Sequence, residues 1–256
     1  MRKRKLEIVV ISDVHLGTYG CHADELLAYL SSISTKTLIL NGGIVDIWQF
    51  KESYFPPSHV NVIKKIISIA SEGTAVYYLT GNHDNIPASL ERTAFGNITF
   101  CKELVLNLDG KKTWFFHGAI LDIPLVDAKW IAKLGSIGFA LLLRVNKLMN
   151  WTLKLRKREK YSLSWKIKAN KAQSKYKLDF EHTVTGLAAN NGYDCVVSGH
   201  IHEPKKEQRE TSQGNILYLN SGDWVENRTA LEYSFKRWKL YQNEKDKLNS
   251  FFKETV

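Results

Sequence analysis

The sequence predicts an α/β fold in which helices cover a sheet of parallel strands. Three short apolar runs, rich in β-branched residues, alternate with two segments that have apolar residues at helical spacing. The runs are Leu6–Ile11, Thr37–Leu40 and Ala75–Leu79, and the helical segments are Ala23–Ser32 and Val60–Ser71. A strand, helix, strand order implies crossover connections, which join parallel strands. The first third of the chain therefore predicts a parallel sheet.

The middle of the chain predicts two neighbouring strands followed by a long helical region. The strands are Ile98–Leu108 and Lys112–Phe116, and Asp109-Gly110 between them is a strong hairpin signal. From about residue 125 to residue 177 the pattern is helical and basic. This region therefore differs in character from the strands before it.

The last part of the chain returns to an α/β pattern. A helix over Leu178–Asn190 leads to a strand, Cys195–Val197. Two further segments, Ile216–Leu219 and Thr229–Tyr241, are expected to be closing strands. The sequence shows no internal repeat and no low-complexity tail.

The composition is that of an ordinary soluble globular protein. The chain has 256 residues, of which 44% are hydrophobic and 24% charged, so it can bury a full core. Three widely spaced cysteines without a CxxC pair favour reduced thiols and a cytoplasm-like compartment. The basic start, residues 1–5, precedes an apolar run too short for a signal peptide. No apolar stretch reaches the ~18 residues of a membrane span.

The positive charge is concentrated in one segment. The net charge is +10, and residues 129–177 hold fourteen Lys or Arg and a single acid, Glu159. This segment alone has a net charge of +13, which leaves about −3 for the remainder. The basicity therefore belongs to the helical region and not to the chain as a whole.

Residues that bind metals follow four of the predicted strands. These are Asp13 and His15, then Asn82, His83 and Asp84, then His117, and finally His200 and His202. Ligands of open α/β sheets lie beyond the carboxyl ends of the strands, so these side chains are expected to share one cleft. Mixed His, Asp and Asn ligands suit Mn, Fe or Zn better than Ca.

Simpler interpretations exist for each cluster alone. Asp13 could cap a turn with His15 on the surface, and the other histidines could be satisfied core residues. What favours a metal site is the repetition of these residue types at four strand-to-loop junctions.

These clusters resemble the motifs of the calcineurin-like metallophosphoesterases. The matches are Asp13-x-His15, Gly81-Asn82-His83-Asp84, His117 and Gly199-His200-x-His202, in the family's order and spacing, and the resemblance covers essentially the whole chain. It implies a four-layer α-β-β-α sandwich with a helical cap insertion. Residues 1–124 and 178–256 would form the core, and residues 125–177 the basic cap.

Within that family the chain looks most similar to the UDP-2,3-diacylglucosamine diphosphatases of lipid A biosynthesis. The features that carry this narrower resemblance are Ser12–Gly17, Asp46-Ile47-Trp48, Phe116-His117-Gly118, Asn220–Trp224 and the basic region. The resemblance implies hydrolysis of UDP-2,3-diacylglucosamine to UMP and lipid X.

The resemblance also implies roles for the clustered residues. Asp13, His15 and His202 would hold one divalent metal, and Asn82, His117 and His200 a second, with manganese expected in both. Two such ions can clamp a phosphoryl group and generate hydroxide at neutral pH. His83 would stabilise the developing charge or protonate the leaving oxygen, with Asp84 orienting it. The alternative for His83 is a loop histidine that packs beside the site.

Position 43 departs from the family pattern. The family's second motif is Gly-Asp, and its Asp bridges the two metals, but this chain has Gly43 after Asn41-Gly42. Asp46 corresponds to a later acid of that motif and is expected to be structural or to support a ligand. Ala119 also stands where close relatives have Asp. A degenerate homologue, an engineered inactive form and an alternative ligand set all fit this sequence, and activity is expected to be impaired.

The basic region predicts an anionic, lipid-like partner. Apolar residues between Trp130 and Leu155 are punctuated and followed by cations, the pattern of helices that bind a membrane interface. Arg156, Lys157 and Arg158 are the candidate substrate-binding residues. A packed helical cap with a solvated basic face is the simpler interpretation. The apolar density argues against nucleic acid as the partner, although it would use the same charge.

The predicted protein is therefore a cytoplasmic enzyme peripheral to the inner membrane, with a UDP-linked acylated sugar as substrate. Two other functions remain open at this point. One is a non-catalytic relative that binds lipid or nucleotide, and the other is a metallonuclease or nucleotide phosphodiesterase.

Overall fold

The computed structural model describes residues 3–46, 54–84, 93–119 and 171–246. Within these residues the strands form two sheets, with seven strands in the order β12-β11-β1-β2-β3-β5-β4 and five in the order β6-β7-β8-β10-β9. The first sheet comprises β1 (Arg4–Ile11), β2 (Ile33–Asn41), β3 (Ala75–Leu79), β4 (Ala94–Phe95), β5 (Ile98–Cys101), β11 (Thr229–Ser234) and β12 (Arg237–Gln242). The second comprises β6 (Glu103–Leu108), β7 (Lys111–Phe116), β8 (Cys195–Ser198), β9 (Lys205–Thr211) and β10 (Gly214–Asn220).

Parallel strands occupy the centre of both sheets. In the first sheet β1, β2, β3 and β5 are parallel, with antiparallel strands at both edges. In the second sheet β7, β8 and β10 are parallel, and β6 and β9 are antiparallel edges. The predicted parallel order of the first three strands is confirmed.

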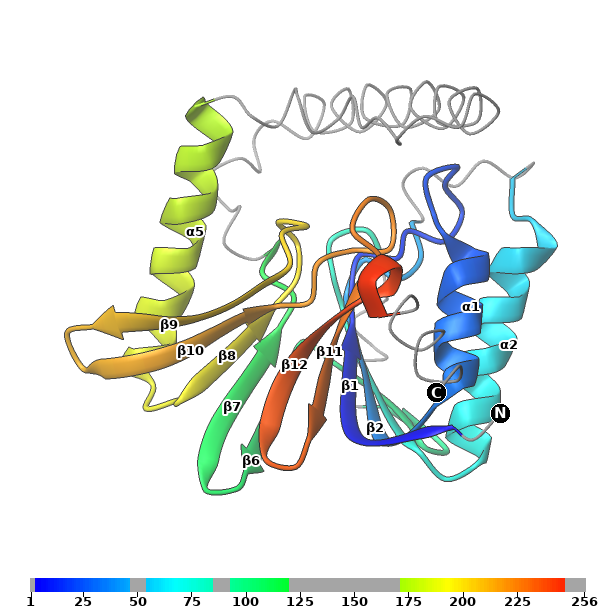
Figure 1. Ribbon diagram of the computed structural model, residues 1–256, viewed down its shortest axis with the longest axis horizontal. Helices are drawn as coiled ribbons and strands as arrows, with labels where there is room; N and C mark the ends of the chain where they lie inside the picture. Colours follow the sequence, from blue (N-terminus) through cyan, green and yellow to red (C-terminus); the bar gives the residue numbers. More distant parts are fainter. Residues whose placement is uncertain (1–2, 47–53, 85–92, 120–170, 247–256) are drawn as a thin grey trace, which may run out of the picture.

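Helices cover the outer face of each sheet (Figure 1). The helices α1 (Ala23–Ser32) and α2 (Pro57–Ser71) lie against the first sheet, and α5 (Lys171–Asn190) lies against the second. The two sheets face each other, so the layers follow the order α-β-β-α. The expected four-layer α/β sandwich is therefore confirmed.

Three apolar layers hold this sandwich together. Side chains of a strand alternate between its two faces, so each strand serves two layers. Val9 and Ile11 of β1 pack under α1 and α2, whereas Ile8 and Val10 pack between the sheets. Each of these side chains is at most 5% exposed. Burying such a side chain contributes about 1.5–3 kcal/mol relative to leaving it in water, so the layers fix the strand ends that carry the site.

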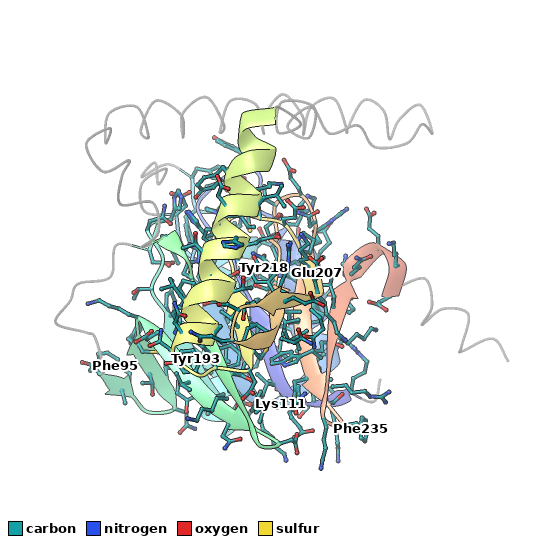
Figure 2. All side chains as sticks on the ribbon, turned by 90° about the vertical axis from the view of Figure 1, so that its left-hand side faces the viewer. Phe95, Lys111, Tyr193, Glu207, Tyr218 and Phe235 are labelled. Carbon is teal, nitrogen blue, oxygen red and sulfur yellow. The ribbon has the colours of Figure 1, made fainter. Side chains whose placement is uncertain are left out.

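The third layer lies between α5 and the second sheet. Phe180 and Val184 of α5 pack on Val196 of β8 and on Tyr218 of β10, and all four are buried. In Figure 2 the helix crosses this sheet in front of the labelled Tyr218 and beside Tyr193. The helix begins at Lys171, before the expected start at Leu178, so it includes the end of the expected cap. Residues 120–170, which include the rest of that cap, lie outside the described residues.

The prediction of one strand over Ile98–Leu108 is wrong. Residues 98–101 form β5, which pairs with β3 in the first sheet, and residues 103–108 form β6, which pairs with β7 in the second. The chain therefore passes from one sheet to the other at Lys102. The predicted hairpin between residues 103 and 116 is confirmed.

The strand β9 was not predicted. Its sequence, Lys205–Thr211, has no apolar run, but its residues alternate between half-buried and exposed as an edge strand requires. None of the helices in the described segments is long and apolar enough to cross a membrane.

Candidate metal centre

The loop after β1 continues to pair with the loop after β2. The backbone N–H of Asp13 donates to the carbonyl of Gly42 (2.9 Å), and that of His15 donates to the carbonyl of Gly43 (2.8 Å). Asp13 and His15 both have positive φ angles, 51° and 54°, an uncommon conformation for residues other than glycine. Such strain of order 1–3 kcal/mol per residue persists where the surroundings fix the backbone, and it is typical of functional sites.

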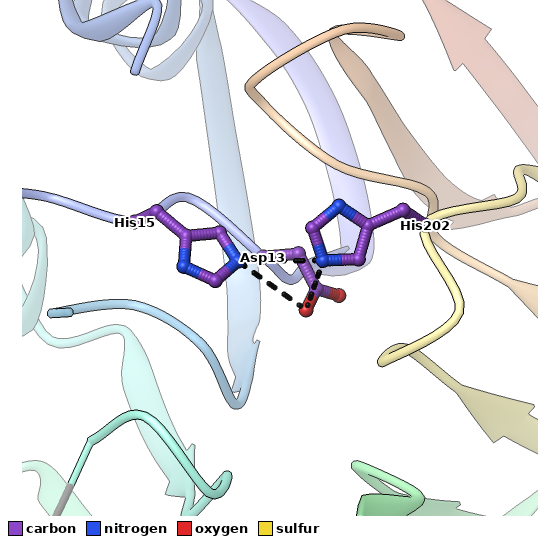
Figure 3. A group of neighbouring side chains, drawn as sticks. All are labelled: Asp13, His15 and His202. Atoms are coloured by element: carbon purple, nitrogen blue, oxygen red, sulfur yellow. Dashed lines mark hydrogen bonds and ion pairs between the residues drawn. The ribbon is translucent and has the colours of Figure 1, made fainter. Parts of the chain in front are cut away.

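Asp13, His15 and His202 form a group that we call the triad (Figure 3). Asp13 Oδ1 lies 3.3 Å from His202 Nε2 and 3.9 Å from His15 Nε2. The two Nε2 atoms are 3.3 Å apart. Three donor atoms from two sheets thus point at a common space, and all three residues are largely buried. The geometry and the chemistry of these donors fit a divalent transition metal.

Asp46 holds the imidazole of His15 in the orientation that this role needs. His15 Nδ1 donates to Asp46 Oδ2 at 3.0 Å, which leaves the lone pair of Nε2 directed at the triad. Burial lowers the pKa of His15, and the hydrogen bond to Asp46 offsets this only partly, so the ring is neutral and able to bind a cation. For Asp46 itself burial raises the pKa, but His15 and His83 outweigh it and hold it below its ordinary value.

The carboxylate beside His83 is that of Asp46. His83 Nδ1 lies 3.2 Å from Asp46 Oδ2, and the ring centroids of His83 and His15 are 4.9 Å apart. We expected Asp84 to orient His83. Instead, the oxygens of Asp84 accept hydrogen bonds from the backbone N–H groups of Gly43, Ile44, Val45 and Gly81 and from the Tyr78 hydroxyl, at 2.6–3.1 Å. In these contacts Asp84 fixes the loop after β2, and Asp46 orients both histidines.

His117 and His200 form a second group, which we call the imidazole pair. Their ring centroids are 5.2 Å apart. His117 Nδ1 donates to the carbonyl of Asn41 at 2.8 Å, so its Nε2 carries a lone pair. This Nε2 is buried and has no hydrogen-bond partner in the described part of the chain. Burial lowers the pKa of His117 to about 4, more than the nearby Asp13 raises it, so the ring is neutral.

Asp13, a member of the triad, also contacts the imidazole pair. Its Oδ2 accepts a hydrogen bond from the backbone N–H of His200 at 3.0 Å. Burial would raise the pKa of Asp13, but the imidazoles of His202, His117 and His15 lower it far below the ordinary value. The carboxylate is therefore ionised and serves both groups.

The loop after β10 is hydrogen-bonded to the loops that carry the ligands. Asn220 Nδ2 donates to the carbonyl of Gly199, and the hydroxyls of Ser12 and Ser221 are hydrogen-bonded to each other. Asp223 Oδ2 lies 3.8 Å from His202 Nδ1 and accepts from Asn227 Nδ2, which also donates to the carbonyl of His202. These contacts explain why the Asn220–Trp224 segment matters: it holds the loops that carry the ligands.

The other residues predicted for the site are Asn82 and three cations of the expected cap. Asn82 lies on the same turn as His83, with an exposed side chain. Arg156, Lys157 and Arg158 lie outside the described residues. Asp46 was expected only in a supporting role, and Asp223 was noted only as part of a motif. No sequence pattern points to the Asn41 carbonyl, which orients His117.

Gly43 lies against Asp13 in the middle of the centre. Its φ angle is +64°, and a Cβ added there would lie 2.9 Å from Asp13 Oδ1 and 3.1 Å from Asp13 Cα. Residue 43 is thus placed where a side chain would enter the space that the ligands surround. As glycine it contributes no charge and no ligand atom there.

Comparison with known proteins identifies the family. The model of the calcineurin-like phosphoesterases matches residues 6–204. The UDP-2,3-diacylglucosamine hydrolase of Blochmanniella pennsylvanica (strain BPEN) is 26% identical over 239 residues, covering 90% of this chain and 93% of that protein. The UDP-2,3-diacylglucosamine hydrolase of Aliivibrio fischeri (strain MJ11) is 25% identical over 257 residues, covering 93% and 99%.

Similarity to solved structures is weaker. An archaeal phosphodiesterase is 13% identical, with a TM-score of 0.46 and coverage of 92% of this chain and 98% of that chain. Nothing about the activity follows from so distant a likeness. The match of the family model over most of the chain, together with the described ligand groups, shows that the chain belongs to the calcineurin-like phosphoesterase family and is a hydrolase of the metallophosphoesterase type.

Proposed function

We propose that this protein hydrolyses the pyrophosphate of a UDP-linked diacylated glucosamine, releasing UMP and a lipid phosphate, and that it uses manganese. The observation that supports a phosphoesterase most strongly is the triad beside the imidazole pair, with Asp13 between them. The substrate is proposed from the name that the related hydrolases carry, at 26% identity or less.

The metal supplies positive charge that binds phosphoryl oxygens and lowers the pKa of a water molecule. Asp13, His15 and His202 would hold this metal. His117 and His200 would contribute ligand nitrogens for a second one. One water is consumed, since the bridging P–O bond breaks and a new P–O bond forms to the water oxygen.

His83 is the residue placed to donate a proton. Its side chain is 25% exposed, whereas that of Asp46 is fully buried. Asp46, 3.2 Å from His83 Nδ1, stabilises the protonated ring and keeps the proton available for the leaving phosphate oxygen. Protonation spares the leaving phosphate monoester the additional negative charge that breaking the P–O bond would otherwise place on it.

Release of UMP from UDP-2,3-diacylglucosamine, measured with and without added manganese, tests this proposal. UDP-N-acetylglucosamine is the matched substrate that lacks the acyl chains, and bis(4-nitrophenyl) phosphate reports general phosphodiesterase activity. Metal-dependent release of UMP from the acylated substrate alone supports the proposal. Hydrolysis of bis(4-nitrophenyl) phosphate without UMP release would identify a nucleotide phosphodiesterase or nuclease. Bound metal without any hydrolysis would identify a non-catalytic relative.

We also propose that the protein is cytoplasmic and peripheral to the inner membrane, with Arg156, Lys157 and Arg158 meeting its anionic lipids. Each cation near such a surface contributes about 1 kcal/mol. Replacing all three with Ser should therefore weaken co-sedimentation with phosphatidylglycerol vesicles by about a hundredfold at low salt. The control is the triple Ser variant of Lys64, Lys111 and Lys112, which removes the same charge from the core surface. Equal binding by both variants would contradict a membrane role for residues 156–158.

A further inference from the structure

The negative charge around the centre is unevenly shared. Asp46 accepts a hydrogen bond from His15. Asp84 accepts five, three from the loop after β2, one from Tyr78 and one from the backbone N–H of Gly81. Asp223 accepts from the backbone N–H groups of residues 225–227. Among the described residues Asp13 is the carboxylate that contacts both ligand groups, whereas Asp84 acts on His117 through its charge alone. The triad includes this carboxylate, whereas the imidazole pair contributes ring nitrogens and no carboxylate of its own.

The imidazole pair nevertheless has a buried ring nitrogen that is suited to bind a cation. The buried Nε2 of His117 is an acceptor without a partner among the described residues. A buried polar atom without a partner is unfavourable, so a native structure that keeps one indicates a ligand. Gly81 leaves the room that this ring needs, because a Cβ at position 81 would lie 2.9 Å from His117 Nε2. A cation is the ligand that a deprotonated, neutral imidazole nitrogen binds.

A cation at the pair would lack charge compensation. A divalent ion in the triad already uses the charge of Asp13, and a second ion close by would be repelled by the first. Position 43, whose side chain would enter between the ligands, is glycine. Neutral imidazoles can coordinate the second ion but cannot offset its charge. Among the described residues no further carboxylate contacts the pair, so an anionic ligand is the source of negative charge that this centre favours.

We propose that the triad holds one divalent cation at rest and that His117 and His200 bind a second only together with a phosphate group. The oxygens of the phosphate supply the negative charge that residue 43 does not provide. By linkage, the second cation and the phosphate increase each other's affinity by the same factor. This inference rests on the proposed function for the identity of the natural phosphate, which is the pyrophosphate of the substrate.

Manganese binding to the full chain with and without inorganic phosphate tests the inference. Equilibrium dialysis should give about one tightly held ion per chain without phosphate and about two with it. Electron paramagnetic resonance is the second readout, because two neighbouring Mn²⁺ ions couple and weaken the signal of the isolated ion. Two ions without phosphate, or one ion under both conditions, would overturn the inference and leave the proposed function intact. No ion under either condition would instead overturn the proposed function.

His117→Ala locates the second ion. It should keep the first ion and lose the one that depends on phosphate, whereas His182→Ala, at an exposed position on α5, should behave as the parent protein. A phosphate-dependent ion that persists in His117→Ala would place it elsewhere and refute the assignment.

Gly43→Asp tests where the missing charge belongs. At a φ of +64° Asp is better tolerated than most residues, although its Cβ forces Asp13 to shift. This variant should bind two ions without phosphate. Gly43→Asn has the same shape and no charge, so it should keep the phosphate dependence. Equal behaviour of the two would show that charge at position 43 is not the cause. Both variants carry the same backbone strain at position 43, so the strain does not affect the comparison between them. The dialysis of the parent protein, with and without phosphate, already decides the inference.

Discussion

The triad and the imidazole pair present the same kind of ligand atom in different surroundings. In the triad, His15 donates to the buried carboxylate of Asp46, and Asp13 lies within 4 Å of both imidazole nitrogens. In the pair, His117 donates to a backbone carbonyl, which carries no net charge. Both His15 and His117 use Nδ1 in these hydrogen bonds and direct Nε2 toward the centre, so the difference lies in charge and not in ligand type.

Because of this difference, the two groups should hold cations with unequal strength. A carboxylate behind an imidazole fixes its tautomer and raises its basicity, whereas a carbonyl fixes the tautomer only. The triad is therefore organised for a cation in the absence of substrate. In the imidazole pair the ring of His117 is oriented for a cation, but no carboxylate supports it. Three predictions test this contrast, beginning with the largest expected effect.

Asp13→Asn should remove most of the metal binding of the triad. The amide has the size of the carboxylate and its oxygen can still accept from the backbone N–H of His200, so the fold is retained. The negative charge is lost, and we expect manganese affinity and phosphodiester hydrolysis to fall by more than about 100-fold. Isothermal titration with Mn²⁺ measures the affinity. The control is Asp24→Asn on the exposed side of α1. Unchanged affinity would mean that the ion does not bind at the triad.

Asp46→Asn should have the next largest effect, although Asp46 is not itself a member of the triad. The amide oxygen can still accept from His15 Nδ1, but without the negative charge of the carboxylate the ring is less basic and binds a cation more weakly. We expect a loss of about 10–100-fold in manganese affinity. The rate should also fall at saturating metal, because His83 loses its carboxylate partner. Asp194→Asn, at an exposed acceptor far from the centre, is the control. A slower rate with unchanged manganese affinity would show that Asp46 acts on His83 and does not support His15 as a ligand.

The parts of the fold that depend on local pattern could be predicted from the sequence. The alternation of buried strands and helices over residues 6–79 gave the parallel order, because apolar spacing reports which faces are covered. The break at Lys102 could not be predicted, since the segments on both sides of it have the same strand character. Which sheet each joins is decided by tertiary packing. The strand β9 was missed because its stability comes from pairing with β10 and not from apolar residues.

The site followed the same division. Residue types at strand ends indicated Asp13, His15 and His202, which the structure brings within ligand distance of one another. The partners of these residues depend on geometry that no spacing encodes. A carbonyl such as that of Asn41 has no sequence signal at all. The sequence around Asp84 does not distinguish an acid that binds backbone N–H groups from a partner of His83. Only the folded arrangement shows that Asp46 lies beside His83 and that Asp84 binds the loop after β2.

The smallest predicted effect concerns the stability of the metal-free protein at acidic pH. Burial lowers the pKa of His117 to about 4 in the folded protein, against about 6.5 when the chain is unfolded. Between these values the unfolded chain binds a proton that the folded one does not, so the free energy of unfolding should fall as the pH drops from about 6.5 to about 4. Above this window His117 has no effect. The depressed pKa of Asp13 acts only below the window, since its ordinary value is about 4.

His117→Gln cannot titrate and can still donate to the Asn41 carbonyl, so its stability should depend less on pH by roughly 1 kcal/mol at pH 5.5. Urea unfolding in the presence of a chelator, from pH 7.5 to pH 4.5, measures the difference, with His182→Gln as the exposed control. Parallel pH curves for His117→Gln and the parent would show that His117 is not held neutral by burial, and the contrast between the imidazole pair and the triad would then lose its electrostatic basis.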